Sequence, residues 1–239
     1  MDFSSNKVQT ALYPSSSMAK LTREMLSLND PNLLKTVPFN GIPLVHHAIS
    51  EHLARCRGMD VDPDQIIVGS GIEYLYSRLM QLDRLAQSGV SLMRVSPANS
   101  FPLGSVMPIR RRLDLLSWLD QDNSRYLIED DFDSELNSYG NPATPIFGAD
   151  PGERTIYLNS FSKTLVPSLR ISYMVLPPAL IERYLATMTF YSYTVSGSDQ
   201  YVLARFVQDG YFEPLERLRE GLLRLKDCIA PESGSSAHI

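Results

Sequence analysis

A lysine held between two apolar runs is the feature that most constrains how this chain folds. Residues 155–158 and 171–176 each read as a short buried strand, and Lys163 lies in the segment that joins them. A lysine flanked by hydroxyl groups in such a segment is poorly placed as a solvated surface charge. Burial lowers the pKa of a lysine, and the neutral amine can attack a carbonyl group. The alternative is a loop lysine beside a Ser/Thr turn.

The neighbours of Lys163 favour a carbonyl compound that carries a phosphate. Ser160 and Ser162 supply hydroxyl groups, and Arg170 supplies a cation that can bind phosphate through two hydrogen bonds. Pyridoxal 5'-phosphate (PLP) needs a lysine for its aldehyde and donors for its phosphate. The sequence therefore predicts PLP as the cofactor.

A glycine turn gives a second candidate contact for the phosphate. The buried strand 65–68 runs into Gly69, Ser70 and Gly71, and a helix pattern follows from Ile72 to about residue 82. This order places the backbone at Ser70 and Gly71, and a helix N-terminus, against an anion. Glycine turns are also common for packing reasons alone, so the contact is inferred only together with Lys163 and Arg170.

Two polar segments follow other predicted strands. Asn99 comes just after the strand 91–95, where open α/β sheets bind ligands, although it could also cap a Pro/Gly turn. The strand 126–128 runs into an acidic segment that contains Glu129, Asp130, Asp131 and Asp133. A magnesium or calcium site is one interpretation, but no EF-hand spacing or histidine supports it. A carboxylate facing a protonated pyridine nitrogen is the second, and solvated helix caps that account for most of the four are the third.

The alternation of strands and helices up to residue 176 predicts an α/β fold with a doubly wound, mainly parallel sheet, followed by a helical last third. We expect a helix at 109–119, with Leu113, Leu116 and Trp118 forming its apolar face. Other helices are expected at 15–27, from Pro43 to Gly58, at 178–191, at 197–209 and at 212–229. The expected organisation is an N-terminal segment (1–40), a cofactor-binding core (41–190), C-terminal helices (191–230) and a disordered tail (231–239).

Composition excludes several classes of protein. The 239 residues carry 22 Lys and Arg against 27 Asp and Glu, so the net charge of -5 argues against direct nucleic-acid binding. The dense basic run 110–112 reads as a solvated helix end. Cys56 and Cys228 are far apart and form no metal-binding or redox spacing, so no metal is predicted. With no signal peptide and no membrane-spanning run, we expect a cytoplasmic protein.

Several motifs, in order, resemble one family. They are the lysine segment 160–165 with Pro167, Leu169, Arg170 and Tyr173; the acidic segment 126–135; the loop 96–104 with 107–112; and the glycine turn 65–74. Together they are similar to fold-type I PLP enzymes, and most of all to the aminotransferase class I/II domain of the MocR-type regulators in the GntR superfamily. The resemblance runs from about residue 2 to residue 229 and implies a three-layer α/β/α core.

The resemblance implies a role for each matched residue. Lys163 would form the internal aldimine and move the α-proton of the substrate, and Asp130, 33 residues before it, would pair with the pyridinium nitrogen. Asn99 would contact the phenolic oxygen of the cofactor. The phosphate would be held by Ser160, Arg170 and the backbone at Ser70 and Gly71. Ser162 is the adjacent hydroxyl, either a further contact or a residue that only shapes the turn. Homodimerisation is expected from the family.

The chain also departs from the family. Phe132 stands where a tyrosine is usual, and Ile72 replaces a threonine or serine. An apparent deletion near 82–90 removes the segment with the aromatic residue that stacks on the cofactor. The C-terminal small domain with the substrate-carboxylate arginine, and a winged-helix domain, are also expected to be absent. Three functions stay open: an aminotransferase acting on an amino acid and a 2-oxo acid, an effector-sensing domain of a MocR-type regulator, and an inactive truncated remnant.

Overall fold

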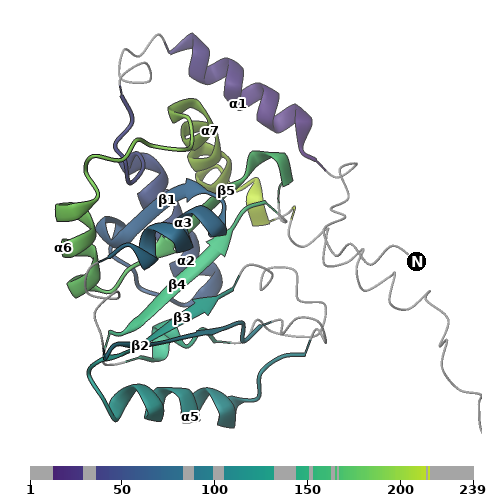
Figure 1. Cartoon of the computed structure of the whole chain (residues 1–239). Coiled ribbons are helices and arrows are strands. Elements are labelled where there is room, and N and C mark those ends of the chain that lie inside the picture. The colour runs from purple at the N-terminus through teal and green to yellow at the C-terminus, as the bar shows by residue number, and fades with distance from the viewer. Residues whose placement is uncertain are drawn as a thin grey trace, which may run out of the picture.

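The computed structural model shows strands and helices alternating along the chain (Figure 1). It describes residues 13–28, 36–82, 89–98, 105–131, 144–150, 153–162, 165, 167–213 and 215. The α-helices are α1 (Ser15–Ser27), α2 (Pro43–Arg57), α3 (Ile72–Met80), α5 (Ile109–Asp120), α6 (Pro178–Thr187) and α7 (Gly197–Gln208). The strands are β1 (Ile66–Ser70), β2 (Ser91–Val95), β3 (Arg125–Asp130), β4 (Thr155–Ser160) and β5 (Ile171–Val175), and the short 3-10 helices are η3 (Pro63–Gln65), η5 (Phe147–Ala149) and η6 (Pro167–Leu169).

The five strands form one sheet in the order β1-β5-β4-β3-β2. Strands β2, β3 and β4 pair in parallel, whereas β5 is antiparallel to both of its neighbours, β1 and β4. Because β1 and β4 are both antiparallel to β5, they run in the same direction as each other. The prediction of a mainly parallel sheet is confirmed, and β5 is the one reversed strand.

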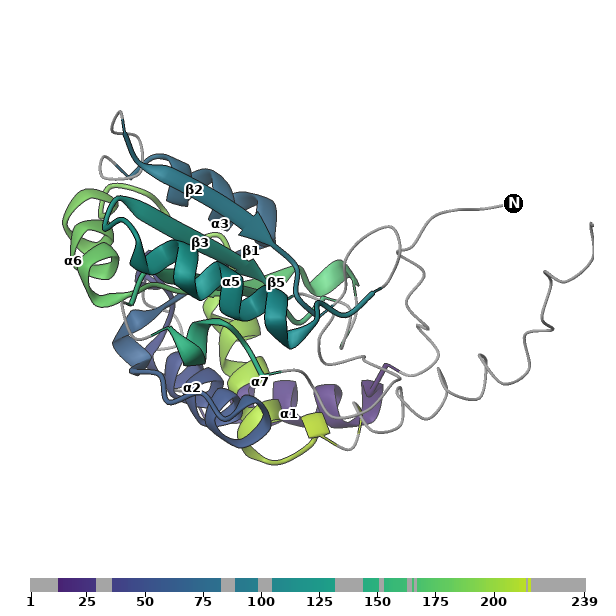
Figure 2. The same ribbon diagram turned by 90° about the horizontal axis from the view of Figure 1, so that it is seen from below.

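Helices cover both faces of the sheet. On one face, Ile128 and Leu158 belong to an apolar cluster with residues of α3 and α6. On the other face, Tyr157 and Tyr173 pack with α2 and α7, which lie side by side (Figure 2), and Leu127 packs with α5. Helix α1 packs against α7. This is the predicted three-layer α/β/α arrangement.

Proline and glycine residues set the ends of several helices and strands. Pro43 occupies the first turn of α2, where its missing N–H costs no hydrogen bond, and Gly58 ends that helix with a left-handed φ of 63°. Gly71, with a φ of 94°, separates β1 from α3. The strand, glycine turn and helix predicted around this residue are therefore confirmed.

Some predicted helix details were wrong. Helix α6 ends at Thr187 rather than at residue 191, because the backbone leaves the helical region at Met188, whose side chain is buried. In α5 the buried apolar residues are Leu115 and Leu119, whereas Leu113 is 55% exposed.

The basic run 110–112 also differs from its prediction as a solvated helix end. Arg112 is buried, and its guanidinium donates to the backbone carbonyls of Met107, Thr144 and Pro97. These bonds explain its burial, because a buried cation is tolerated when its donors are satisfied. Residues 83–88, which hold most of the proposed deletion, and the tail 231–239 lie outside the described residues, as does most of the predicted helix 212–229.

Candidate functional site

The sheet topology gathers the predicted phosphate-binding residues at one edge. Because β5 runs against its neighbours, its first residues lie beside the last residues of β1 and β4. Ile171 pairs with Ser70, and Ser172 pairs with Ser160. Arg170, one residue before β5, therefore lies at the same edge as the glycine turn and the lysine segment.

Arg170 packs directly over the glycine turn. A Cβ atom added to Gly71 would lie 2.8 Å from Nη2 of Arg170, so no other residue fits at this position without a shift. Arg170 has a left-handed φ of 47°, which is unusual for a residue with a side chain. Its Nη2 lies 3.2 Å from Oε2 of Glu73, in the first turn of α3, and its side chain is 57% exposed. A cation and a helix N-terminus thus face solvent together.

The backbone of the glycine turn is only partly available to a ligand. The N–H of Ser70 donates to Oγ1 of Thr194 at 3.0 Å, and the N–H of Gly71 donates to the carbonyl of Gly69 at 3.0 Å. The first N–H groups of a helix have no partner within the helix. Anion binding at this turn would therefore fall to the start of α3 rather than to the N–H groups of these two residues.

The serines of the lysine segment form a small hydroxyl cluster. Oγ of Ser172 donates to Oγ of Ser160 at 2.9 Å, and Ser160 donates to Oγ of Ser162 at 3.0 Å. Ser160 is buried, whereas Ser162 is half-buried. Ser162 is thus the more accessible of the two predicted phosphate contacts. Lys163 and Asn99 lie outside the described residues.

Asp130 ends β3 in a buried position and points to the opposite face of the sheet from Glu129 and Asp131. Its Oδ2 forms an ion pair with Arg94 of β2, whose Nε lies 3.2 Å away. Its Oδ1 is buried without a hydrogen-bond partner within the described part of the chain. An unpaired buried acceptor is costly, and such an atom calls for an explanation such as a missing ligand.

Arg94 is a neighbour of Asp130 that the sequence patterns did not single out. Its guanidinium lies 5.5 Å from the ring centroid of Tyr76 in α3, and its side chain is 49% exposed, against 2% for the side chain of Asp130. The available signal was a charged residue inside the apolar strand 91–95, on the strand next to the one that ends in Asp130.

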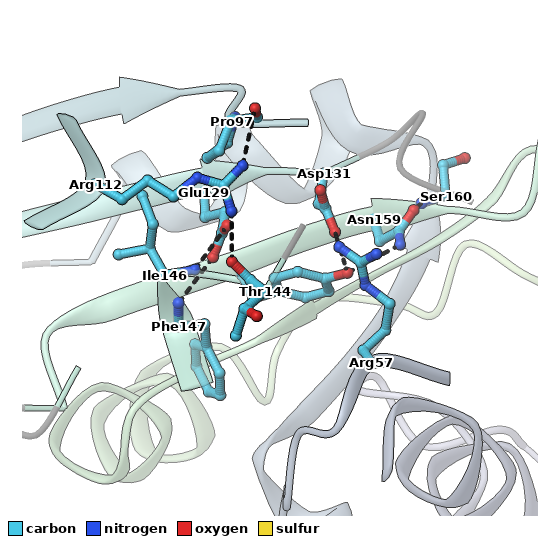
Figure 3. A network of polar contacts seen from close by, with 11 residues as sticks. Arg57, Pro97, Arg112, Glu129, Asp131, Thr144, Ile146, Phe147, Asn159 and Ser160 are labelled. Carbon is cyan, nitrogen blue, oxygen red and sulfur yellow. Dashed lines mark hydrogen bonds and ion pairs between the residues drawn. The ribbon is translucent and has the colours of Figure 1, made fainter. Parts of the chain in front are cut away.

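Glu129 and Asp131 point the other way, into a buried polar network (Figure 3). The two carboxylate oxygens of Glu129 accept hydrogen bonds from the N–H groups of Ile146 and Phe147, at 2.9 and 2.8 Å. Burial and the nearby charge of Asp131 raise the pKa of Glu129 to about 7. The prediction that most of the acids are solvated helix caps was wrong for these three, since each is at most 3% exposed. Asp133 lies outside the described residues.

The second half of this network connects α2 to the lysine segment. Oδ2 of Asp131 forms a buried ion pair with Arg57 and accepts from the hydroxyl of Tyr157 at 2.8 Å. That hydroxyl also accepts from Nδ2 of Asn159 at 3.1 Å, and Oδ1 of Asn159 accepts from the N–H of Ser160 at 2.6 Å. The network therefore extends from Arg57 to Ser160 at the end of β4 (Figure 3).

Known proteins with similar sequences include HTH-type transcriptional regulators and an aromatic-amino-acid aminotransferase of Thermococcus litoralis, which is 28% identical over 61% of this chain and 34% of that protein. The chain is 29% identical to the uncharacterized HTH-type transcriptional regulator YhdI of Bacillus subtilis, over 98% of this chain and 58% of that protein. It is 28% identical to the probable rhizopine catabolism regulatory protein MocR of Rhizobium meliloti, over 87% of this chain and 50% of that protein. The chain is a homologue of MocR-type regulators. No family model matches it.

The structural comparison confirms the predicted fold. An archaeal alanine:glyoxylate aminotransferase superposes with a TM-score of 0.77 over 95% of this chain and 70% of that one, at 17% sequence identity. The chain therefore has the fold-type I aminotransferase-like fold that the sequence predicted.

The chain spans only about half to three fifths of the length of the two regulators compared. The alignment with YhdI runs over 273 positions, 34 more than the 239 residues of this chain, so YhdI carries residues within the aligned region that this chain lacks. Within the described residues, no helix is both long enough and apolar enough to cross a membrane.

Proposed function

We propose that this MocR-type chain binds PLP at the sheet edge formed by β1, β3 and β4, as an aminotransferase-like domain. The observation that carries the proposal is the buried Oδ1 of Asp130, an acceptor with no partner in the described part of the chain. A protonated pyridine nitrogen supplies the single N–H donor that this oxygen lacks. The position also matches the residue that the family resemblance assigns to this contact.

The phosphate end fits the same cofactor. Arg170 provides an exposed cation beside the N-terminus of α3, over a glycine that leaves room for it. Ser162 adds an accessible hydroxyl within hydrogen-bonding distance of Ser160. Helix N-termini and arginine side chains both favour phosphate. The residues at both ends therefore fit PLP.

Each of the proposed residues has a distinct task. Bound PLP supplies an aldehyde that accepts an amine and a ring that withdraws electrons. Asp130 would hold the proton on the ring nitrogen, and Lys163 would provide the amine that anchors the cofactor and moves the α-proton of the substrate. Asn99 would contact the phenolic oxygen. The substrates would be an amino acid and a 2-oxo acid, and the expected assembly is a homodimer.

Effector sensing is the second candidate function, and Arg94 favours it. Because Arg94 already binds Oδ2 of Asp130, the carboxylate is shared between two cations when the ring nitrogen is protonated. The positive charge of Arg94 opposes that protonation and so weakens the ring as an acceptor of electrons. A site of this kind holds an amino compound better than it turns one over. The regulator names of the relatives agree with this candidate.

A titration with PLP tests the proposal. The wild-type chain should develop the absorbance of lysine-bound cofactor, and borohydride reduction followed by peptide mapping should place the label on Lys163. Lys163→Ala is the control and should give no label. Absence of any labelled peptide in the wild type would support the inactive remnant instead.

Amino-acid donors then separate the two remaining functions. Release of pyridoxamine phosphate identifies an aminotransferase. A spectral change on adding an amino acid, without pyridoxamine phosphate, identifies a sensor.

A further inference from the structure

Three side chains with different ligand atoms meet between α2 and the segment that follows α7. His52 and Cys56 both lie on α2, and Glu213 follows α7. One ligand atom from each residue lies within 4.8 Å of the other two. Residues four apart share one face of a helix, which explains why the first two side chains point to the same place.

The surroundings orient these side chains. Glu213 is held by Arg55, also on α2, whose Nη2 lies 3.1 Å from Oε1 of the carboxylate. His52 is fully buried, and the ring of Phe212 stands edge-on to it at 4.9 Å between centroids. Hydrogen-bonded carboxylates and packed imidazole rings are typical of metal ligands, because their orientation is set in advance.

We propose that His52, Cys56 and Glu213 bind one zinc ion. An imidazole nitrogen, a thiolate and a carboxylate are the ligands that Zn²⁺ takes, whereas Mg²⁺ and Ca²⁺ prefer oxygen alone. Tetrahedral zinc at the usual bond lengths separates its ligand atoms by about 3.4 Å, so side-chain adjustments of about 1 Å close the site. Water completes the fourth position.

The ligand charges suit a divalent ion. Binding displaces the proton of the Cys56 thiol into the buffer, so a thiolate and the Glu213 carboxylate face Zn²⁺ with two negative charges, and the site keeps the one positive charge of Arg55. Arg55 can remain on one carboxylate oxygen while the other takes the metal. The ion would fasten the segment after α7 to α2. The ring of His52 also lies 6.5 Å from that of Phe161 between centroids, and Phe161 follows directly after β4.

A calorimetric titration of the full chain with Zn²⁺, after a chelator has removed any bound metal, tests the proposal. We expect one Zn²⁺ per chain, with affinity at least ten-fold lower in Cys56→Ser and in Glu213→Gln. His47→Gln is the matched control, because His47 is exposed on the same helix. Cys228→Ser controls for the other thiol. Equal affinity in Cys56→Ser and the wild type would overturn the proposal.

Cobalt substitution gives a measurement that does not depend on the folding of any variant. Co²⁺ added to the wild-type chain should produce a thiolate-to-metal charge-transfer band together with the visible bands of tetrahedral Co²⁺. Both should persist in Cys228→Ser. A wild-type spectrum with no thiolate band would overturn the site as proposed. Because no PLP is added, neither result depends on the proposed function.

Discussion

At the end of β3, two neighbouring carboxylates on opposite faces of the sheet have different surroundings. Asp131 is enclosed by a buried cation and a phenol, with Arg57, Tyr157 and Asn159 forming a continuous chain of polar contacts. Asp130 has a half-exposed arginine on one oxygen and no partner on the other within the described residues. A strand alternates its side chains between faces. One acidic segment can therefore serve structure on one side and a ligand on the other.

Asp131→Asn should have the largest effect on stability. Asparagine keeps an acceptor for Tyr157 but leaves the buried charge of Arg57 without its counter-charge. Removing one partner of a buried ion pair typically costs about 3–5 kcal/mol. Urea unfolding of the variant should show this loss, and a loss below about 1 kcal/mol would mean that the pair is not desolvated in solution.

Glu129 should make stability depend on pH. Its pKa is raised from 4.5 to about 7 in the folded chain, so the folded state keeps its proton while the unfolded state loses it. The contribution of Glu129 is therefore complete below pH 4.5 and is lost as the pH rises to about 7, by about 3 kcal/mol. Urea midpoints of the wild type and Glu129→Gln should lie closest at about pH 4 and separate as the pH rises to about 8, because only the wild type carries a group that loses its proton there. Parallel curves would contradict the raised pKa.

Asp130→Asn should weaken PLP binding while changing stability little. Loss of a hydrogen bond to a charged group costs about 1.5–3 kcal/mol, which corresponds to a ten- to hundred-fold weaker affinity. The stability of the apo chain should change by less than about 1 kcal/mol, because Arg94 is half-exposed and its ion pair is screened by solvent. Fluorescence titration with PLP and urea unfolding measure the two quantities. A stability loss as large as that of Asp131→Asn would remove the distinction between the two faces.

The sequence predicts the elements of this fold better than the partners within it. Strand, glycine turn and helix around Gly71 follow from local patterns of apolar residues and glycine, and so does the placement of Arg170 before β5. The prediction that these acids are solvated was wrong because the partner of Asp131 is Arg57, 74 residues earlier in the chain. No local sequence pattern indicates a pair so far apart. The proximity of Asp130 and Arg94 depends on β2 pairing with β3, which emerges only once the sheet is assembled.

Arg94→Leu is the sharpest test of how Asp130 is used, although its effect should be the smallest. Without Arg94, the carboxylate has only the ring nitrogen of PLP as a charged partner, and the cofactor no longer competes with a resident cation. A half-exposed ion pair contributes about 0.2–1 kcal/mol, so PLP affinity should rise by a factor of about 1.4 to 5. Arg78→Leu is the matched control, because the guanidinium of Arg78, like that of Arg94, lies over an aromatic ring, 3.5 Å from the ring centroid of Tyr191.

The sign of the Arg94→Leu effect distinguishes two roles for this arginine. Tighter PLP binding, together with faster release of pyridoxamine phosphate from amino-acid donors, means that Arg94 restrains the ring nitrogen and holds the domain toward sensing. Weaker PLP binding means that Arg94 instead orients Asp130 for the cofactor, since the unsupported carboxylate would then rotate away or take up a proton in its buried position. In that second case the argument for sensing would rest on the relatives alone, and the aminotransferase would become the better supported function.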